Sequence, residues 1–229
     1  MDILALDIET TGLDPMEDDV IEFAAHTDGR TTDVFIDTDR ESDPGAFDVH
    51  GLTRDYVHRH ARGRSRREAL EAVARLLTHP GITVVAHNAR FAFTMLISNM
   101  VRSQCDPSLI RDMHSIIPLD TMVMDRMLLP NAHSRSRSLR PLCSSCGIDV
   151  PESIGAKVDA RLIYELAWMQ VDSLIEEGVA ESELPRLVAR RAVEQQQERA
   201  VWVESHGGDP EEPGYPCDPM VIDSLELDF

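Results

Sequence analysis

The fold is decided by one N-terminal stretch, Ile3-Leu4-Ala5-Leu6-Asp7-Ile8-Glu9-Thr10-Thr11-Gly12-Leu13-Asp14-Pro15. Its apolar first half is typical of a buried β-strand, and the Thr-Thr-Gly that follows predicts a turn. Successive side chains of a strand point to opposite faces, so Asp7 and Glu9 share one face and lie close enough to hold a divalent cation together. The alternative is a strand whose polar edge happens to carry two acids, although buried carboxylates without a partner are costly.

Three segments, in order along the chain, resemble motifs of the DnaQ-like 3′–5′ exonucleases, the family of the proofreading epsilon subunit of bacterial DNA polymerase III. Residues 7–15 resemble the first motif, D-x-E-T-T-G-x-x-P, and residues 87–96 resemble the second, H-N-A-x-F-D-x-x-x-L. Residues 154–160 resemble the third, H-x-A-x-x-D-A. A minor signature, Val49-His50-Gly51-Leu52-Thr53, is similar to the family's I-H-G-I-T segment.

The resemblance implies an α/β fold, a mixed five-stranded ribonuclease H-like sheet flanked by helices. The residue pattern itself predicts two further strands, over 19–26 and 32–36, antiparallel to the first. A loop over 41–47, an amphipathic helix over 68–77 and a buried strand over 82–86 follow. Asp120 or Thr121 is expected to cap the next helix, and two periodic helices are expected over 161–176 and 183–202.

The resemblance also implies a two-cation site for Mg²⁺ or Mn²⁺ that cuts the 3′-terminal phosphodiester bond. By matching positions, Asp7, Glu9 and Asp159 are the expected metal ligands. The position of the second motif's aspartate is Ala92, and the position of the general-base histidine is Ile154. A lost general base alone typically lowers the rate by about 10²–10⁴-fold, so we expect this sequence to be inactive or strongly impaired as a nuclease.

The same match implies contacts with the substrate by residues beside the catalytic positions. These expected substrate-binding residues are Thr10, Thr11, His50, Asn88 and Phe91. On residue type alone, His50 is equally compatible with a structural histidine. Arginine-rich residues 59–67 are either the solvated start of a helix or a flank that contacts phosphates.

Two explanations for Ala92 and Ile154 stay open from the sequence. They are substitutions introduced into an active exonuclease, or they mark a natural binding module that holds nucleic-acid 3′ ends or the replication machinery without cutting. The family resemblance favours the 3′ end of single-stranded DNA over RNA as the ligand. A purely structural scaffold is a third class, against which the retention of Asp7, Glu9 and Asp159 speaks.

Composition limits the other possibilities. A net charge of −19 argues against a protein that coats nucleic acid through bulk electrostatics. Four irregularly placed cysteines do not form a disulfide scaffold, which favours a reducing cytoplasm. No run approaches the about 18 apolar residues of a membrane span.

The chain is expected to divide into an exonuclease domain, residues 1–203, and an acidic flexible tail, residues 204–229. The tail ends in Ser224-Leu225-Glu226-Leu227-Asp228-Phe229, which resembles the Q-L-x-L-x-F peptide that docks replication proteins on the sliding clamp. Leu225, Leu227 and Phe229 would fill the clamp's apolar pocket, and Ser224 replaces the usual glutamine. The alternative is a tail that folds back onto the body or stays disordered.

Overall fold

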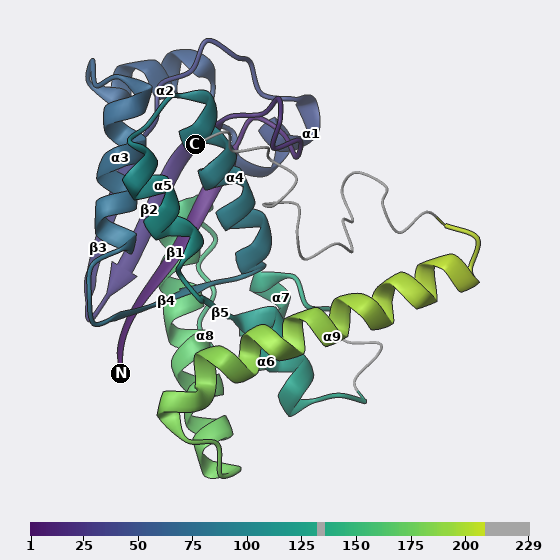
Figure 1. Cartoon of the computed structure of the whole chain (residues 1–229). Helices are drawn as coiled ribbons and strands as arrows, with labels where there is room; N and C mark the ends of the chain where they lie inside the picture. Colours follow the sequence, from purple (N-terminus) through teal and green to yellow (C-terminus); the bar gives the residue numbers. More distant parts are fainter. Residues whose placement is uncertain (132–135, 209–229) are drawn as a thin grey trace.

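The computed structural model describes residues 1–131 and 136–208, and these residues form a mixed sheet between layers of helices (Figure 1). The strands are β1 (Asp2–Thr10), β2 (Val20–Thr27), β3 (Arg30–Phe35), β4 (Ile82–Ala86) and β5 (Leu119–Asp120). They lie in the order β3-β2-β1-β4-β5. β1 is antiparallel to β2 and parallel to β4, and β4 is parallel to β5. The predicted α/β, ribonuclease H-like sheet of five strands is confirmed.

Helices follow the strands along the chain and cover both faces of the sheet. They are α1 (Pro44–His50), α2 (Arg54–Ala61), α3 (Arg66–Leu77), α4 (Ala89–Arg102), α5 (Pro107–His114), α6 (Thr121–Leu128), α7 (Leu139–Ser145), α8 (Ala156–Glu176) and α9 (Leu184–Ser205), with a 3₁₀ turn, η1, at Glu181–Glu183. None of these helices is long and apolar enough to cross a membrane.

The alternation of β1 divides the core into two halves. Leu4, Leu6 and Ile8 pack in the larger cluster with α3, α4 and α5. Ile3 and Ala5, on the opposite face, pack in a second cluster with α6, α8 and α9. Asp7 and Glu9 continue the row of Ile3 and Ala5, so the sheet turns both acids toward the side that α8 covers.

Among the boundaries that differ from the sequence prediction in the first third of the chain, those of α1 and β3 have a clear physical reason. The loop expected over 41–47 is wrong in part, because α1 begins at Pro44 and ends at His50, where Gly51, with a φ of 67°, caps it. Proline suits the first turn of a helix, and glycine suits its left-handed end. β3 begins at Arg30 rather than at residue 32 because the Asp28-Gly29 turn, with φ values of 31° and 76°, lets strand pairing continue to its edge.

α8 starts five residues earlier than the expected helix over 161–176, and this places Asp159 in its first turn. Gly155 has a φ of 121°, a conformation that suits glycine, and Glu22 accepts a hydrogen bond from the backbone N–H of Ala156. The helix therefore begins where a strand acid can satisfy one of its free donors.

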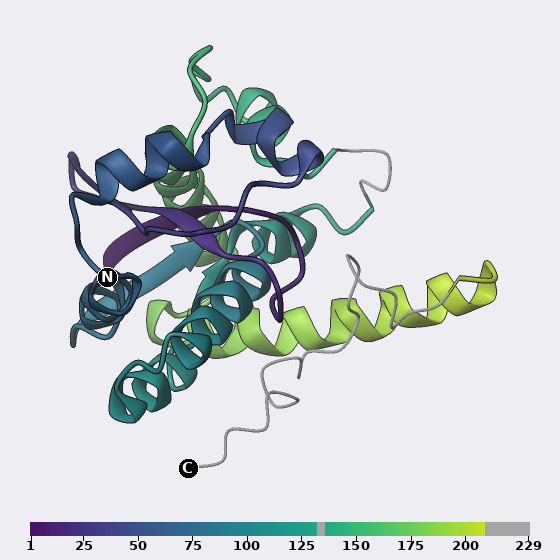
Figure 2. The ribbon, with the colours of Figure 1, turned by 90° about the horizontal axis from the view of Figure 1, so that it is seen from above.

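The last described helix, α9, extends away from the body of the domain (Figures 1 and 2). Its first half packs against the sheet side, where Leu184 and Val188 are buried. Its far end exposes Val201 and Trp202, 67% and 61% exposed. The helix ends just past the expected domain boundary at residue 203, and the clamp-like peptide with Ser224, Leu225, Leu227 and Phe229 lies outside the described residues.

Candidate active site

The predicted site residues lie at the end of the sheet where the parallel strands finish. β1 and β4 pair in register from Asp2 with Ile82 to Leu6 with Ala86, and β4 pairs with β5 at Ala86 and Asp120. The carboxyl ends of β1, β4 and β5 therefore meet at one edge, which is where open α/β sheets place their ligands.

Asp7, Glu9 and Asp159 form the centre of this edge, and we call them, with Glu22, the acid cluster. Asp7, Glu9 and Asp159 are half-buried, and Glu22 is buried. Burial, then Glu9, then Asp159 raise the pKa of Asp7 well above its ordinary value. Burial also raises the pKa of Asp159, which Arg140 partly offsets. These mutual effects show that the fold brings together the three carboxylates that the sequence predicted.

Glu22 is a fourth carboxylate that the sequence reading missed. It lies directly across the β1–β2 ladder from Glu9, so both side chains are on the same face of the sheet. Burial and Glu22 raise the pKa of Glu9 to about 8, and burial and Asp33 raise that of Glu22 to about 7. Only the register between β1 and β2 could have identified Glu22 as a site residue, and this register depends on the turn that joins the two strands.

Arg140 is the cation that contacts Asp159 in this cluster. Its Nη2 donates to Asp159 Oδ1 at 2.8 Å and to the Ser153 carbonyl at 2.7 Å, and its Nη1 donates to the Pro151 carbonyl at 2.9 Å. The guanidinium thus ties the loop between α7 and α8 to the acid cluster, and its charge also lowers the pKa of Glu9.

The two substituted positions supply no catalytic group. Ile154 is 57% exposed in the loop before α8. Ala92, in the first turn of α4, is 4% exposed and belongs to the larger core cluster. A hydrocarbon side chain can neither accept a proton nor bind a cation.

His87, just after β4, does not take over the role of a general base. Its Nε2 lies 2.8 Å from the Arg137 carbonyl, which can only accept, and its Nδ1 lies 2.7 Å from the Thr121 hydroxyl. The proton of the neutral ring is therefore on Nε2, and both nitrogens are used. Burial lowers its pKa further. His87 holds β4 to α6 and to the segment before α7.

His50 lies at the end of α1, 6% exposed. The Leu52 N–H donates to its Nδ1 at 2.9 Å, so the proton of the neutral ring is on Nε2. That nitrogen is buried without a hydrogen bond of normal geometry, beside the backbone of Thr10. Its predicted role in substrate binding stays a prediction.

Asn88 and Phe91 lie at the start of α4. Asn88 is exposed and left-handed, with φ 60°, a conformation that asparagine tolerates well. Asp120 fixes this turn, since its carboxylate accepts the N–H groups of Asn88 at 3.3 Å and Ala89 at 2.7 Å. The same carboxylate caps α6, as the sequence predicted for Asp120 or Thr121. Phe91 is half-buried against the larger core cluster.

Thr10 and Thr11, also predicted to bind substrate, are buried and form internal hydrogen bonds. The Thr10 hydroxyl donates to the Gly12 carbonyl at 2.7 Å. The Thr11 hydroxyl donates to Asp18 Oδ1 at 3.0 Å and accepts the Asp19 N–H at 2.9 Å. These bonds shape the turn after β1, and substrate contact by either residue stays a prediction.

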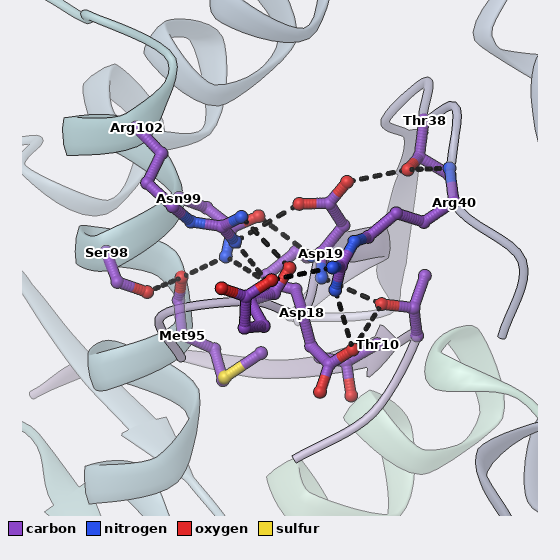
Figure 3. Close-up of polar contacts among 12 residues, drawn as sticks. Thr10, Asp18, Asp19, Thr38, Arg40, Met95, Ser98, Asn99 and Arg102 are labelled. Carbon is purple, nitrogen blue, oxygen red and sulfur yellow. Dashed lines mark hydrogen bonds and ion pairs between the residues drawn. The ribbon is translucent and has the colours of Figure 1, made fainter. Parts of the chain in front are cut away.

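The turn after β1 rests on a second group of buried acids, which we call the Asp18–Asp19 network (Figure 3). Asp19 Oδ1 lies 3.0 Å from Arg66 Nη2 and 3.1 Å from Arg102 Nη2, and its Oδ2 accepts from the Thr38 hydroxyl at 2.6 Å. Asn99, fully buried in α4, donates to the Asp18 carbonyl at 3.1 Å. Arg66, from the arginine-rich segment, is thus structural.

The acid cluster has the oxygen chemistry that Mg²⁺ and Mn²⁺ require, but not the arrangement of the family's two-cation site. In the described part of the chain, no group of three or more His, Cys, Asp or Glu side chains is placed to hold a metal ion. Asp159 is engaged by Arg140, and positions 92 and 154 offer no donor atom. The residues present therefore do not fit that site as it stands.

Comparison with known proteins gives the family. The exonuclease family model RNase_T matches residues 4–167. The PolC-type DNA polymerase III of Mycoplasmopsis pulmonis is 27% identical over 180 residues, 76% of this chain and 12% of the polymerase. That of Oceanobacillus iheyensis is 27% identical over 183 residues, again 12% of its length.

Solved structures support the same fold. Escherichia coli exonuclease I in complex with a dT13 oligonucleotide matches with a TM-score of 0.61 at 21% identity, over 74% of this chain and 40% of that chain. Exonuclease I from Methylocaldum szegediense matches with a TM-score of 0.62 at 22% identity, over 86% of this chain and 45% of that one. The chain therefore spans less than half of each of these relatives. Since the family model covers most of it, the chain belongs to the DnaQ-like 3′–5′ exonuclease family.

Proposed function

We propose that this chain binds the 3′ end of single-stranded DNA and hydrolyses it very slowly or not at all. One observation carries the proposal. Asp7, Glu9 and Asp159 are kept together at the carboxyl edge of the sheet, while Ala92 and Ile154 offer neither a ligand nor a base. The family depends on divalent metal ions, and Mg²⁺ and Mn²⁺ suit the oxygen donors of the acid cluster.

The relatives favour DNA as the ligand. An exonuclease I structure that resembles this fold contains a dT13 oligonucleotide, and the similar sequences belong to DNA polymerases. The half-buried acid cluster and the exposed Asn88 would face a strand end that enters along this edge.

A second candidate, a non-catalytic module of the replication machinery, is favoured by the contact between Arg140 and Asp159. A guanidinium 2.8 Å from a required carboxylate oxygen suits a site that no longer cuts. Docking on the sliding clamp through Ser224, Leu225, Leu227 and Phe229 would suit this candidate too, and it remains a prediction from the sequence alone.

The test restores both missing groups. The Ala92→Asp, Ile154→His double variant should degrade single-stranded DNA with Mg²⁺ or Mn²⁺ at least about 10³-fold faster than the chain as it stands, because it regains a carboxylate and a general base. Shortening of a 5′-labelled oligonucleotide from its 3′ end measures the rate. Adding Asp159→Asn to the double variant is the control and should remove the gain.

Equal rates for the chain and the double variant would mean that residues 92 and 154 are not the positions of the missing groups. Binding gives a separate measure. Fluorescence anisotropy should show tighter binding to linear than to circular single-stranded DNA, and equal binding would contradict recognition of a 3′ end. A linear RNA of the same sequence, used as competitor, tests the preference for DNA.

A further inference from the structure

Five arginines lie between residues 59 and 67, in a chain whose net charge is −19. Two of them, Arg66 and Arg67, pair with acids at 3.0 and 2.9 Å. The other three are exposed, and they are Arg59, Arg62 and Arg64. Among the described residues, no ion pair includes any of these three. This segment therefore presents unpaired positive charge to solvent.

The helix α2 does not itself require all three of these arginines. Cations are favourable near the C-terminus of a helix, which accounts for Arg59 in the last turn of α2. The helix ends one residue before Arg62, so Arg62 and Arg64 lie beyond it. Glu68, within electrostatic reach of Arg64, is held by Ser65 in a capping box. Arg62 and Arg64 are thus available to an anion from outside the domain.

The same helix carries two exposed aromatic rings, those of Tyr56 and His60. They stack with centroids 3.8 Å apart and an angle of 23° between their planes. The His60 Nδ1–H donates to the Tyr56 carbonyl at 2.7 Å, which fixes the histidine ring on the helix. The ring of Phe35, at the end of β3, supports both from below, with centroids 5.7 Å from Tyr56 and 5.2 Å from His60. Exposed rings held in place in this way are surfaces on which nucleobases stack.

These rings lie next to the acid cluster. Glu22 is directly opposite Phe35 on the β2–β3 ladder and directly opposite Glu9 on the β1–β2 ladder. Residues directly opposite each other share a face, so Phe35 continues the row of Glu9 and Glu22. Neighbouring strands lie about 4.8 Å apart, which places Phe35 roughly 10 Å from Glu9 across the sheet. A DNA strand whose 3′ end lies at the acid cluster can therefore reach the rings of α2.

We propose that Tyr56 and His60, together with Arg62 and Arg64, form a second contact site for single-stranded DNA, which we call the ring–arginine site. It binds nucleotides upstream of the 3′ end: the rings stack on bases, and the guanidinium groups contact phosphates. The proposal rests on the proposed function, since it takes single-stranded DNA as the ligand. It requires neither a metal ion nor a free strand end.

The first experiment tests the rings, with the full chain, a fluorescent oligothymidylate and EDTA. Tyr56→Ala should bind about 5- to 10-fold more weakly, the lower part of the range for loss of a stacked ring. Tyr56→Phe keeps the ring and should bind like the unchanged chain. Fluorescence anisotropy measures both affinities.

The second experiment tests the arginines through the dependence of affinity on salt. The Arg62→Gln, Arg64→Gln double variant should bind more weakly, and its plot of log affinity against log salt concentration should be shallower by about 1.4, since each lost phosphate contact of a single strand contributes roughly 0.7. The control is the Arg186→Gln, Arg190→Gln double variant. It makes the same change of charge at exposed residues of α9, a helix that lies apart from α2 in both views (Figures 1 and 2), and should leave the slope unchanged.

A linear strand and the same strand closed into a circle separate this site from recognition of the 3′ end. Tyr56→Ala and the Arg62→Gln, Arg64→Gln variant should weaken binding to both forms by a similar factor and keep any preference for the linear one. If neither variant binds more weakly, the ring–arginine site is overturned and recognition of the 3′ end is unaffected. Weaker binding in only one of the two also overturns it, because the site requires both rings and arginines.

The opposite result is equally distinct. If the unchanged chain binds both forms equally and both variants bind more weakly, recognition of the 3′ end is overturned and the ring–arginine site stands. If the unchanged chain binds neither form, both proposals are overturned.

Discussion

The domain contains two groups of buried or half-buried acids that differ in how their negative charge is compensated. In the Asp18–Asp19 network, Asp19 has two arginines within 3.1 Å and a threonine hydroxyl, and Arg40 approaches Asp18 at 3.5 Å. In the acid cluster, Arg140 lies beside Asp159 and lowers the pKa of Glu9, and Lys157 lowers that of Glu22, yet the pKa values of all four carboxylates are raised. Cations thus balance the carboxylates of the Asp18–Asp19 network, whereas the acid cluster has more carboxylates than cations among the described residues.

This difference distinguishes acids that stabilise the fold from acids that are kept for function. Buried acids that only hold a fold are paired with cations and hydrogen-bond donors, because an unpaired buried charge is costly. Acids that remain crowded and underpaired lower stability and persist where function requires them. The comparison thus supports placing the ligand site at the half-buried Asp7, Glu9 and Asp159 rather than at the buried Asp19.

Removal of an acid from the Asp18–Asp19 network should have the largest effect on stability. Asp19→Ala leaves Arg66 and Arg102 without their carboxylate, and Arg66 is only 21% exposed. We expect the free energy of unfolding to fall by about 3–5 kcal/mol, as for other broken buried pairs. Urea unfolding followed by circular dichroism measures it.

Glu17→Ala is the control for Asp19→Ala, because Glu17 pairs with Arg40 in water, with side chains 67% and 42% exposed. It should cost less than about 1 kcal/mol. Similar losses for both variants would show that the network is not the stabilising element that its geometry indicates.

The second effect concerns the glycine that lets Asp18 approach the turn after β1. A Cβ on Gly12 would lie 2.4 Å from Asp18 Oδ2 and 2.6 Å from its Cγ. Asp18 cannot retreat easily because Thr11 and the Asp14 N–H hold its carboxylate. Gly12→Ala should therefore lower the free energy of unfolding by about 1–3 kcal/mol, the typical cost of overpacking.

Gly45→Ala serves as the control for Gly12→Ala. Gly45 lies within α1, and a Cβ there would meet nothing within 4 Å. Alanine favours a helix over glycine, so this variant should be up to about 1 kcal/mol more stable. An equal loss in both variants would argue against a specific clash with Asp18.

The smallest expected effect is an increase in the free energy of unfolding, caused by a substitution in the acid cluster. Glu22→Gln removes a charge directly across from Glu9 and keeps an oxygen that can accept the Ala156 N–H. In EDTA at pH 8 we expect a gain of up to about 1 kcal/mol, the scale of cross-strand pairs. A melting temperature below that of the unchanged chain would contradict the idea of uncompensated charge.

The gain from Glu22→Gln should depend on pH. The pKa of Glu22 rises from 4.5 to about 7 on folding, so the folded state keeps a proton that the unfolded state releases. Stability of the unchanged chain therefore falls as pH rises between about 4.5 and 7. The two proteins should melt alike near pH 4 and diverge across this window.

Much of the fold was predictable because the residue patterns that indicate its strands and helices are local in the sequence. The apolar run before Asp7 and the strand over 82–86 needed only residue pattern, and the latter matches the structure to the residue. Glu22, the contacts of Arg140 with Pro151, Ser153 and Asp159, and the double role of Asp120 were missed. Each depends on a partner at the far end of another element, and residue spacing along the chain does not reveal it.

The sequence by itself determined the family, the alternation that puts Asp7 and Glu9 on one face, and the absence of an acid at 92 and of a base at 154. Those properties reside in residue identity and in strand period. Only the tertiary structure decided which acids are compensated, because that depends on distances between side chains brought together by folding. Asp19 meets two arginines from α3 and α4, whereas Asp159 meets one that also holds a loop.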